Sequence, residues 1–188
     1  MFAAMPSPFR EMARLAALTL MRLGEIVTLR REYVRLEQGV VALPRGKAGA
    51  RHVILSREAQ KLLASQLASH GSAWVFPAPH GQPYHRVHVS RVWRKAADKA
   101  GLKDFHFHDL RHHGATMALN AGFTAPVVMA LGGWKTERMM RRYAAVTDKT
   151  LRAAAEVVAG NLVLRANGRA NTPPKSLTRL ALAVPSQG

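Results

Sequence analysis

The chain has 188 residues and no cysteine, which excludes a disulfide framework and a cysteine-based zinc site. Lys and Arg total 28 against 11 Asp and Glu, a formal charge of +17 that is spread along the whole length. This excess favours a polyanionic partner, most simply nucleic acid, over general solubility. The apolar run 15–21 is too short to cross a membrane, so we expect a soluble protein of a reducing compartment.

The first predicted element is a helix capped by Ser7, with Pro8 at the first helical position. Apolar residues recur at helical spacing over 9–23, so the helix is expected to be buried. Arg22 emerges near its end and needs an anion close by. Glu25, at i+3, either simply pairs with Arg22 or orients it toward an anion from outside.

A β-hairpin is predicted next, with strands over 39–43 and 53–55 and a glycine-rich turn over 45–51. The cations of the turn are Arg45, Lys47 and Arg51. A charged hairpin can simply discourage edge-to-edge pairing of strands. Alternatively, the hairpin is a finger that brings Lys47 to a phosphate.

Two helices follow the hairpin. Ser56 is expected to cap a helix with an apolar face of leucines at 62, 63 and 67. The helix predicted over 87–100 is basic and ends at Gly101. Its cations are Arg91, Arg94, Lys95 and Lys99.

The segment 105–113 is predicted to begin a further helix, with Asp109 in the first turn and Gly122 as the C-cap. His108 and Arg111 are three residues apart and so share a helix face. An imidazole beside a guanidinium suits a phosphate oxyanion, and we expect Arg111 to point at phosphate and not at the core. Surface histidines near a salt-bridged arginine would give the same pattern.

The last third predicts three helices, over 127–131, 135–146 and 151–163. Gly132-Gly133 breaks the first of them, and Trp134 follows. The second contains Arg141, Arg142 and Tyr143. Residues 164–188 contain Asn, Gly, Pro and Ser and read as a basic flexible tail, so we expect a domain over 1–163 and a tail over 164–188.

Five separated pieces carry matching chemistry. They are Met21-Arg22-Leu23-Gly24-Glu25, Lys47, His108-Asp109-Leu110-Arg111-His112, Leu131-Gly132-Gly133-Trp134 and Arg142-Tyr143. In order and spacing they resemble the tyrosine recombinase (phage integrase) family over about residues 8–160. The resemblance implies an α+β, mainly α-helical catalytic domain, a helical bundle with a small antiparallel β-sheet.

By the same resemblance, Arg22 and Arg111 bind the scissile phosphate, Glu25 supports Arg22, and His108 assists proton transfer. It also implies that the remaining DNA contacts come from Arg45, Arg51, Arg91, Arg94, Lys95, His112, Arg141 and Arg142.

The resemblance assigns the chemistry of strand exchange to three further residues. Tyr143 attacks to form a 3′-phosphotyrosyl link, Lys47 protonates the leaving 5′ hydroxyl, and Trp134 donates its indole N–H or packs beside the nucleophile. The implied function is site-specific DNA recombination or integration, without a metal or other cofactor. The implied partner is double-stranded DNA, bound by a homotetramer in a bacterial or phage-infected cytoplasm, at the nucleoid.

Two departures from the family pattern affect the expectation. Leu20 stands where the family usually has Gly, which can alter how Arg22 is aimed. The chain also starts almost at the catalytic domain, so we expect a truncated integrase, or alternatively a catalytically inactive DNA-binding remnant or regulator. A metal-dependent phosphohydrolase built on His108, Asp109, His112 and His113 is a third reading, but the sequence offers no clear further ligands.

Overall fold

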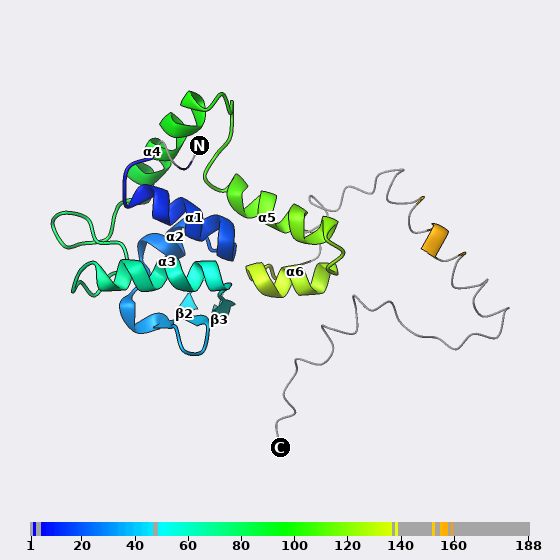
Figure 1. The fold of residues 1–188 in the computed structure, drawn as a ribbon, viewed down its shortest axis with the longest axis horizontal. Helices are drawn as coiled ribbons and strands as arrows, with labels where there is room; N and C mark the ends of the chain where they lie inside the picture. The colour runs from blue at the N-terminus through cyan, green and yellow to red at the C-terminus, as the bar shows by residue number, and fades with distance from the viewer. Residues whose placement is uncertain are drawn as a thin grey trace, which may run out of the picture. The chain divides into compact units, whose positions relative to one another are not determined.

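A computed structural model shows a mainly helical bundle with one small antiparallel sheet (Figure 1). It describes residues 2, 5–46, 49–136, 138, 152, 155–157 and 159, without the side chains of 45 and 46. The α-helices are α1 (Phe9–Thr19), α2 (Leu23–Val27), α3 (Arg57–Ala68), α4 (Arg86–Lys99), α5 (Asp109–Asn120) and α6 (Ala125–Gly132). A 3-10 helix, η2 (Arg31–Tyr33), precedes the strands β1 (Val34–Arg35), β2 (Val40–Gly46) and β3 (Gly49–Ile54). The predicted fold class, α+β and mainly helical, is therefore confirmed.

The chain separates into two compact units, Met1–Ala144 and Ala145–Gly188. All the helices and strands named above lie in the first unit. In the second unit the described positions are helical, in line with the helix predicted over 151–163. The helix 135–146 falls largely outside the described residues and the tail 164–188 entirely so, and the domain boundary at 163 stays a prediction. Within the described ranges, no helix has the length and apolarity needed to cross a bilayer.

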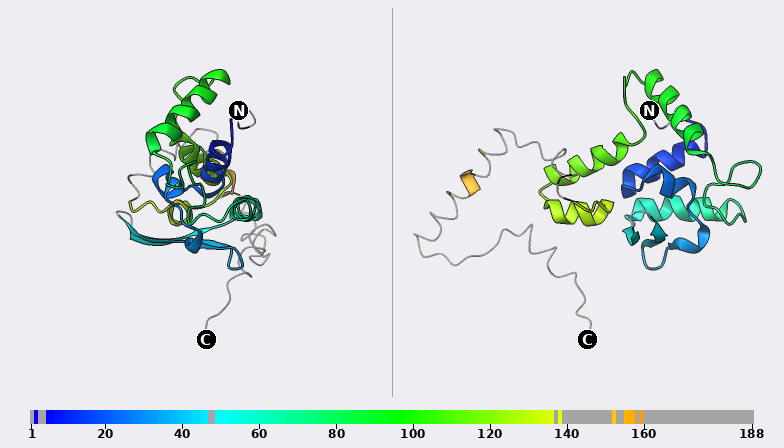
Figure 2. Two further views of the ribbon diagram at one scale, coloured as in Figure 1. Left: turned by 90° about the vertical axis from the view of Figure 1, so that its left-hand side faces the viewer. Right: turned by 180° about the vertical axis from the view of Figure 1, so that it is seen from behind.

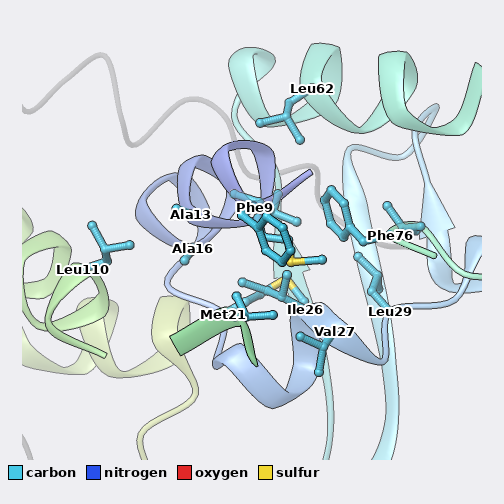
Figure 3. Close-up of a cluster of buried hydrophobic side chains, with 14 of the residues drawn as sticks. Phe9, Ala13, Ala16, Met21, Ile26, Val27, Leu29, Leu62, Phe76 and Leu110 are labelled. Atoms are coloured by element: carbon cyan, nitrogen blue, oxygen red, sulfur yellow. The ribbon is translucent and has the colours of Figure 1, made fainter. Parts of the chain in front are cut away.

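The core forms around α1, which contacts α2, α3, α4 and α5. Figure 3 shows Phe9, Ala13 and Ala16 of α1 lying near Met21 and Ile26, and all five are buried. The sheet and α4 lie on opposite sides of α1 and α2 (Figure 2). This packing fixes the segment that follows α1, and that segment carries the first piece of the site pattern, residues 21–25.

The first predicted helix is shorter at both ends than the sequence indicates. It begins at Phe9 because Pro8 occupies the N-cap position without a side-chain cap, so the assignment of Ser7 as the cap is wrong. It ends at Thr19, not at residue 23, because Leu20 is in the left-handed region with φ 55°. The backbone N–H of Met21 then donates to the Thr19 hydroxyl at 3.4 Å, which stabilises the exit from the helix.

The hairpin is longer than predicted and has a shorter turn. β2 extends to Gly46 and β3 begins at Gly49, and these two residues pair across the hairpin after a shift in register. Arg51 therefore lies within a strand and not in a turn, and β1 adds a third strand before the two of the predicted hairpin.

Three local predictions are confirmed. The Ser56 hydroxyl accepts from the backbone N–H of Ala59 and caps α3. The basic helix α4 lies within one residue of its predicted bounds. Helix α5 begins at Asp109, and Gly122 follows its end with φ +92°.

Helices α1 and α5 pack through a close contact at Gly114. An added Cβ there would lie 2.3 Å from Leu20 Cδ2, and the Leu20 side chain is buried beside Ala115, Val128 and Trp134. The Leu20 side chain therefore occupies the space that Gly114 leaves open. We infer that this contact also stabilises the left-handed backbone conformation of Leu20.

We expect Gly114→Ala to lower the free energy of unfolding by about 1 kcal/mol net. Overpacking against Leu20 costs about 1–3 kcal/mol, and the higher helix propensity of alanine returns about 1 kcal/mol. Urea unfolding measures the difference. Gly71→Ala is the matched control, because a Cβ there has no neighbour within 4 Å and φ is not positive. Equal stability of the two variants would contradict the tight contact.

Candidate functional site

Arg22 and Glu25 form an ion pair at the start of α2. Arg22 Nη1 lies 2.9 Å from Glu25 Oε1, and the Arg22 backbone N–H donates to Glu25 Oε2 at 2.8 Å. This closes the first turn of α2 and fixes the direction of the Arg22 side chain, which remains one-third exposed (33%). The pair expected from the i,i+3 spacing is therefore present, and its arginine is open to solvent.

Arg111 is buried, contrary to the expectation that it points away from the core. It is only 2% exposed, and its Nη1 donates to the carbonyl of Leu20. The Trp134 ring covers its face, with Arg111 Cζ 3.8 Å from the ring centroid. Hydrogen bonding and cation–π stacking together offset the loss of hydration of this buried cation. Trp134 thus contacts Arg111, and the two roles expected for it stay predictions, because Tyr143 lies outside the described residues.

His108 lies at the start of α5, next to these cations. Its ring is perpendicular to that of His112, with centroids 4.4 Å apart. Loss of hydration, followed by the charges of His112, Arg111 and Arg22, lowers the pKa of His108 below 6.5, while Asp109 opposes the shift. The lowered pKa favours the neutral imidazole, the form that can accept a proton.

The fold brings together residues that are far apart in the sequence. Arg22 Nη2 donates to the carbonyl of Gly133 at 3.1 Å, which joins the start of α2 to the end of α6. Arg111 contacts both Leu20 and Trp134, and so connects α5 to the end of α1 and to the segment after α6. Three of the five sequence pieces thus meet at one site, with two arginines and an imidazole.

Arg51 lies in an ion pair of the site, and its predicted contact with DNA stays a prediction. Its side chain is only 11% exposed, and its Nη2 pairs with Glu25 Oε2 at 2.8 Å. Loss of hydration would raise the pKa of Glu25, but the Arg22 N–H and the two guanidinium groups outweigh it and lower that pKa below 4.5. Arg51 therefore belongs to the ion-pair network of the site, a role the hairpin pattern did not reveal.

The basic helix α4 presents its predicted DNA contacts to solvent. Val89 and Trp93 are buried on one face. The exposed cations Arg91, Arg94 and Lys95 lie away from that face. His112 is half-buried against His108, so a DNA contact there stays a prediction.

Several predicted site residues lie outside the described residues. They are Lys47, Arg141, Arg142 and Tyr143, together with the side chain of Arg45. Among the described residues, no group of three or more His, Asp or Glu side chains is placed to hold a metal ion. The carboxylate of Asp109 instead accepts from the backbone N–H of His106 at 2.6 Å, in the turn before α5.

We expect Gly132→Ala to displace Trp134 from Arg111. A Cβ at residue 132 would lie 1.8 Å from Cζ3 of the Trp134 ring, so the ring must move. The chain has three tryptophans, and their indole N–H signals can be followed by ¹⁵N NMR, with Trp134→Phe giving the assignment. The signal of Trp134 should shift in Gly132→Ala but not in Ala130→Ser, an exposed change in the same helix. An unmoved signal would contradict the stacked arrangement.

We also expect the pKa of His108 to lie below 6.5, and to rise when His112 is replaced by Gln. The positive charge of His112 is one of the causes that lower it, so its removal makes protonation of His108 easier. An NMR titration of the imidazole signals, assigned with His108→Gln, measures both values. Replacement of the exposed His113 by Gln is the matched control. A downward shift in His112→Gln would exclude this electrostatic coupling.

Comparisons with known proteins identify relatives in sequence and in fold. The integrase of Salmonella phage P22 is 30% identical over 151 residues, which cover 73% of this chain and 39% of that protein. The XerA recombinase has a similar fold, with TM-score 0.63 and 24% identity over 80% of this chain and 65% of that one. A lambda integrase tetramer bound to a Holliday junction gives TM-score 0.57 and 21% identity over 70% of this chain and 42% of that one.

The family relationship covers most of the sequence. The chain spans about two-fifths of the length of the P22 integrase. A sequence model described as the phage integrase family matches residues 3–150, which include all the motif pieces assembled above. The chain therefore belongs to the phage integrase family, the family that its motifs resemble.

Proposed function

We propose that this chain cleaves and rejoins DNA strands in site-specific recombination, through a 3′-phosphotyrosyl intermediate. The observation that carries the proposal is the convergence of Arg22, His108 and Arg111. Two guanidinium groups beside a neutral imidazole suit a phosphodiester whose equatorial oxygens gain negative charge as it reacts. The net charge of +17 and the exposed cations of α4 support double-stranded DNA as the source of that phosphate.

In the proposed reaction, the Tyr143 hydroxyl attacks the scissile phosphorus and the bond to the 5′ oxygen breaks. A tyrosine hydroxyl titrates near pH 10, so attack needs a proton acceptor or a strongly cationic site. Neutral His108 is the proposed acceptor, and Lys47 is the proposed donor of the proton to the leaving 5′ oxygen. The new phosphotyrosyl bond conserves the energy of the broken bond, so rejoining needs no external energy source.

The two arginines would meet the phosphate at different stages. Arg22 is one-third exposed and can meet DNA in the described conformation. Arg111 is covered, so binding a phosphate there requires Trp134 to move. Gly132 and Gly133 precede Trp134, and the lack of a Cβ at both positions gives that segment backbone freedom. We therefore propose that DNA binding opens the site.

The proposed assembly and location follow from relatives. The lambda integrase structure contains a tetramer on a Holliday junction, and we propose a homotetramer on DNA for this chain as well. The related integrase of phage P22 supports a cytoplasmic location. The affinity for DNA proposed above would place the protein at the nucleoid. The predicted DNA contacts at Arg45, Arg141 and Arg142 belong to this proposal.

We expect the protein to form a covalent adduct with a DNA duplex nicked near the cleavage point. The adduct should survive boiling in detergent, and Tyr143→Phe should reduce it to background because the attacking oxygen is gone. Both proteins should bind DNA with the same affinity and a log–log salt slope of about −0.9 per phosphate contact. Tyr33→Phe, at a half-buried tyrosine on η2, is the matched control and should form the adduct normally.

The other candidate functions give different results in the same assay. A DNA-binding remnant without chemistry would show the salt slope but no adduct from the folded wild type. A metal-dependent phosphohydrolase would lose activity with EDTA, whereas the proposed reaction should be unchanged. An adduct that persists in Tyr143→Phe would exclude Tyr143 as the nucleophile.

A further inference from the structure

Glu25 is shared by two arginines from different elements. Its Oε1 lies 2.9 Å from Arg22 Nη1, and its Oε2 lies 2.8 Å from Arg51 Nη2. An ionised carboxylate has about four lone-pair positions, so it can accept from both guanidinium groups at once. Glu25 thereby connects strand β3, which carries Arg51, to the start of α2.

The same two arginines reach the C-terminal end of α6. Arg22 Nη2 donates to the Gly133 carbonyl at 3.1 Å, and Arg51 Nη1 lies 3.5 Å from the Leu131 carbonyl. Carbonyl groups at a helix C-terminus lack intrahelical partners and carry the negative end of the helix dipole. Cations at this position therefore stabilise the end of α6, directly before Trp134.

The Arg51 side chain packs closely against Gly133, directly after α6. An added Cβ at Gly133 would lie 2.7 Å from Arg51 Cδ and 2.8 Å from its Nε. Gly133 also has φ +70°, which side chains rarely adopt. The Arg51 stem thus fills the space beside the glycine, and the backbone before Trp134 rests against it.

We propose that Arg51 is a positioning residue of the site, which acts through Glu25 on Arg22 and through the end of α6 on Trp134. The proposal rests on the function proposed above. A phosphate that binds Arg22 competes with the Gly133 carbonyl for Nη2. Arg51 continues to bind Glu25 and the end of α6 when Arg22 turns to the phosphate. Glu25 and the segment before Trp134 therefore keep their positions.

The electrostatics of Glu25 give this arrangement a measurable consequence. The charge of Arg51 and its hydrogen bond are two of the causes that keep the pKa of Glu25 below 4.5, against loss of hydration. Without Arg51, that pKa rises. Glu25 then becomes protonated at a higher pH, and the acid limb of the reaction rate should move upward in pH.

Arg51→Met, which keeps the apolar stem, tests the proposal with three readouts: the reaction rate, DNA binding and the Trp134 indole signal. At saturating nicked DNA, the single-turnover rate of adduct formation should fall about 10- to 100-fold, the cost expected of a misplaced group. DNA affinity and salt slope should be unchanged, and the Trp134 indole signal should shift. Arg51→Lys should recover part of the rate, because an ammonium can pair with Glu25 but lacks the fork that also reaches α6.

Two controls separate positioning from a general loss of structure. Arg35→Met changes an exposed arginine on the same sheet and should alter neither the rate nor the indole signal. In a Glu25→Gln background, Arg51→Met should lower the rate less than in the wild type, because one of the two routes through which Arg51 acts is already changed. If Arg51→Met does not fold, as judged by circular dichroism, Arg51→Lys carries the same comparison.

The outcomes distinguish this proposal from the function on which it rests. A wild type without adduct overturns the proposed reaction, whereas the indole signal still tests the position of Trp134. A smaller salt slope in Arg51→Met means that Arg51 contacts phosphate directly, and overturns the positioning role. An unmoved indole signal, with a rate equal to that of Arg35→Met, overturns it as well.

Discussion

The site depends on a guanidinium group that the protein withdraws from water. Arg111 is 2% exposed, and a cation in such a place must replace its hydration with protein contacts. The Leu20 carbonyl and the Trp134 ring supply these contacts, one from a residue far before Arg111 in the sequence and one from a residue after it. Burial of one charge thus fixes the relative positions of α1, α5 and the segment after α6.

The unusual backbone at Leu20 follows from the same requirement. A left-handed conformation is unfavourable for leucine, and tertiary contacts must compensate for it. Arg111 bonds the Leu20 carbonyl, and the Leu20 side chain packs over Gly114. The chain reverses here and delivers Arg22 into the site only two residues later. The departure from the family's usual glycine is therefore accommodated by side-chain packing.

Local patterns predicted most of the helices, because amphipathic spacing and caps act over a few residues. Ser56 and Asp109 are examples, and each starts a helix as expected. The sequence did not predict the end of α1, because the conformation of Leu20 depends on contacts with α5, which lies some ninety residues later. It also misplaced Arg51, because a cation near a glycine-rich turn resembles an exposed residue until its partner, Glu25, is known. Motif order identified Arg22, His108 and Arg111 as a group, but it could not show that Arg111 is covered.

The covered state of Arg111 has a consequence for selectivity. If the proposed function holds, part of the binding energy of DNA is used to uncover this arginine, so it does not appear as affinity. Non-target DNA that offers fewer contacts would bind through the α4 cations and leave the site latent. The protein would then discriminate between DNA sequences by the rate at which Arg111 is uncovered after binding. Non-target DNA would be bound without being cut.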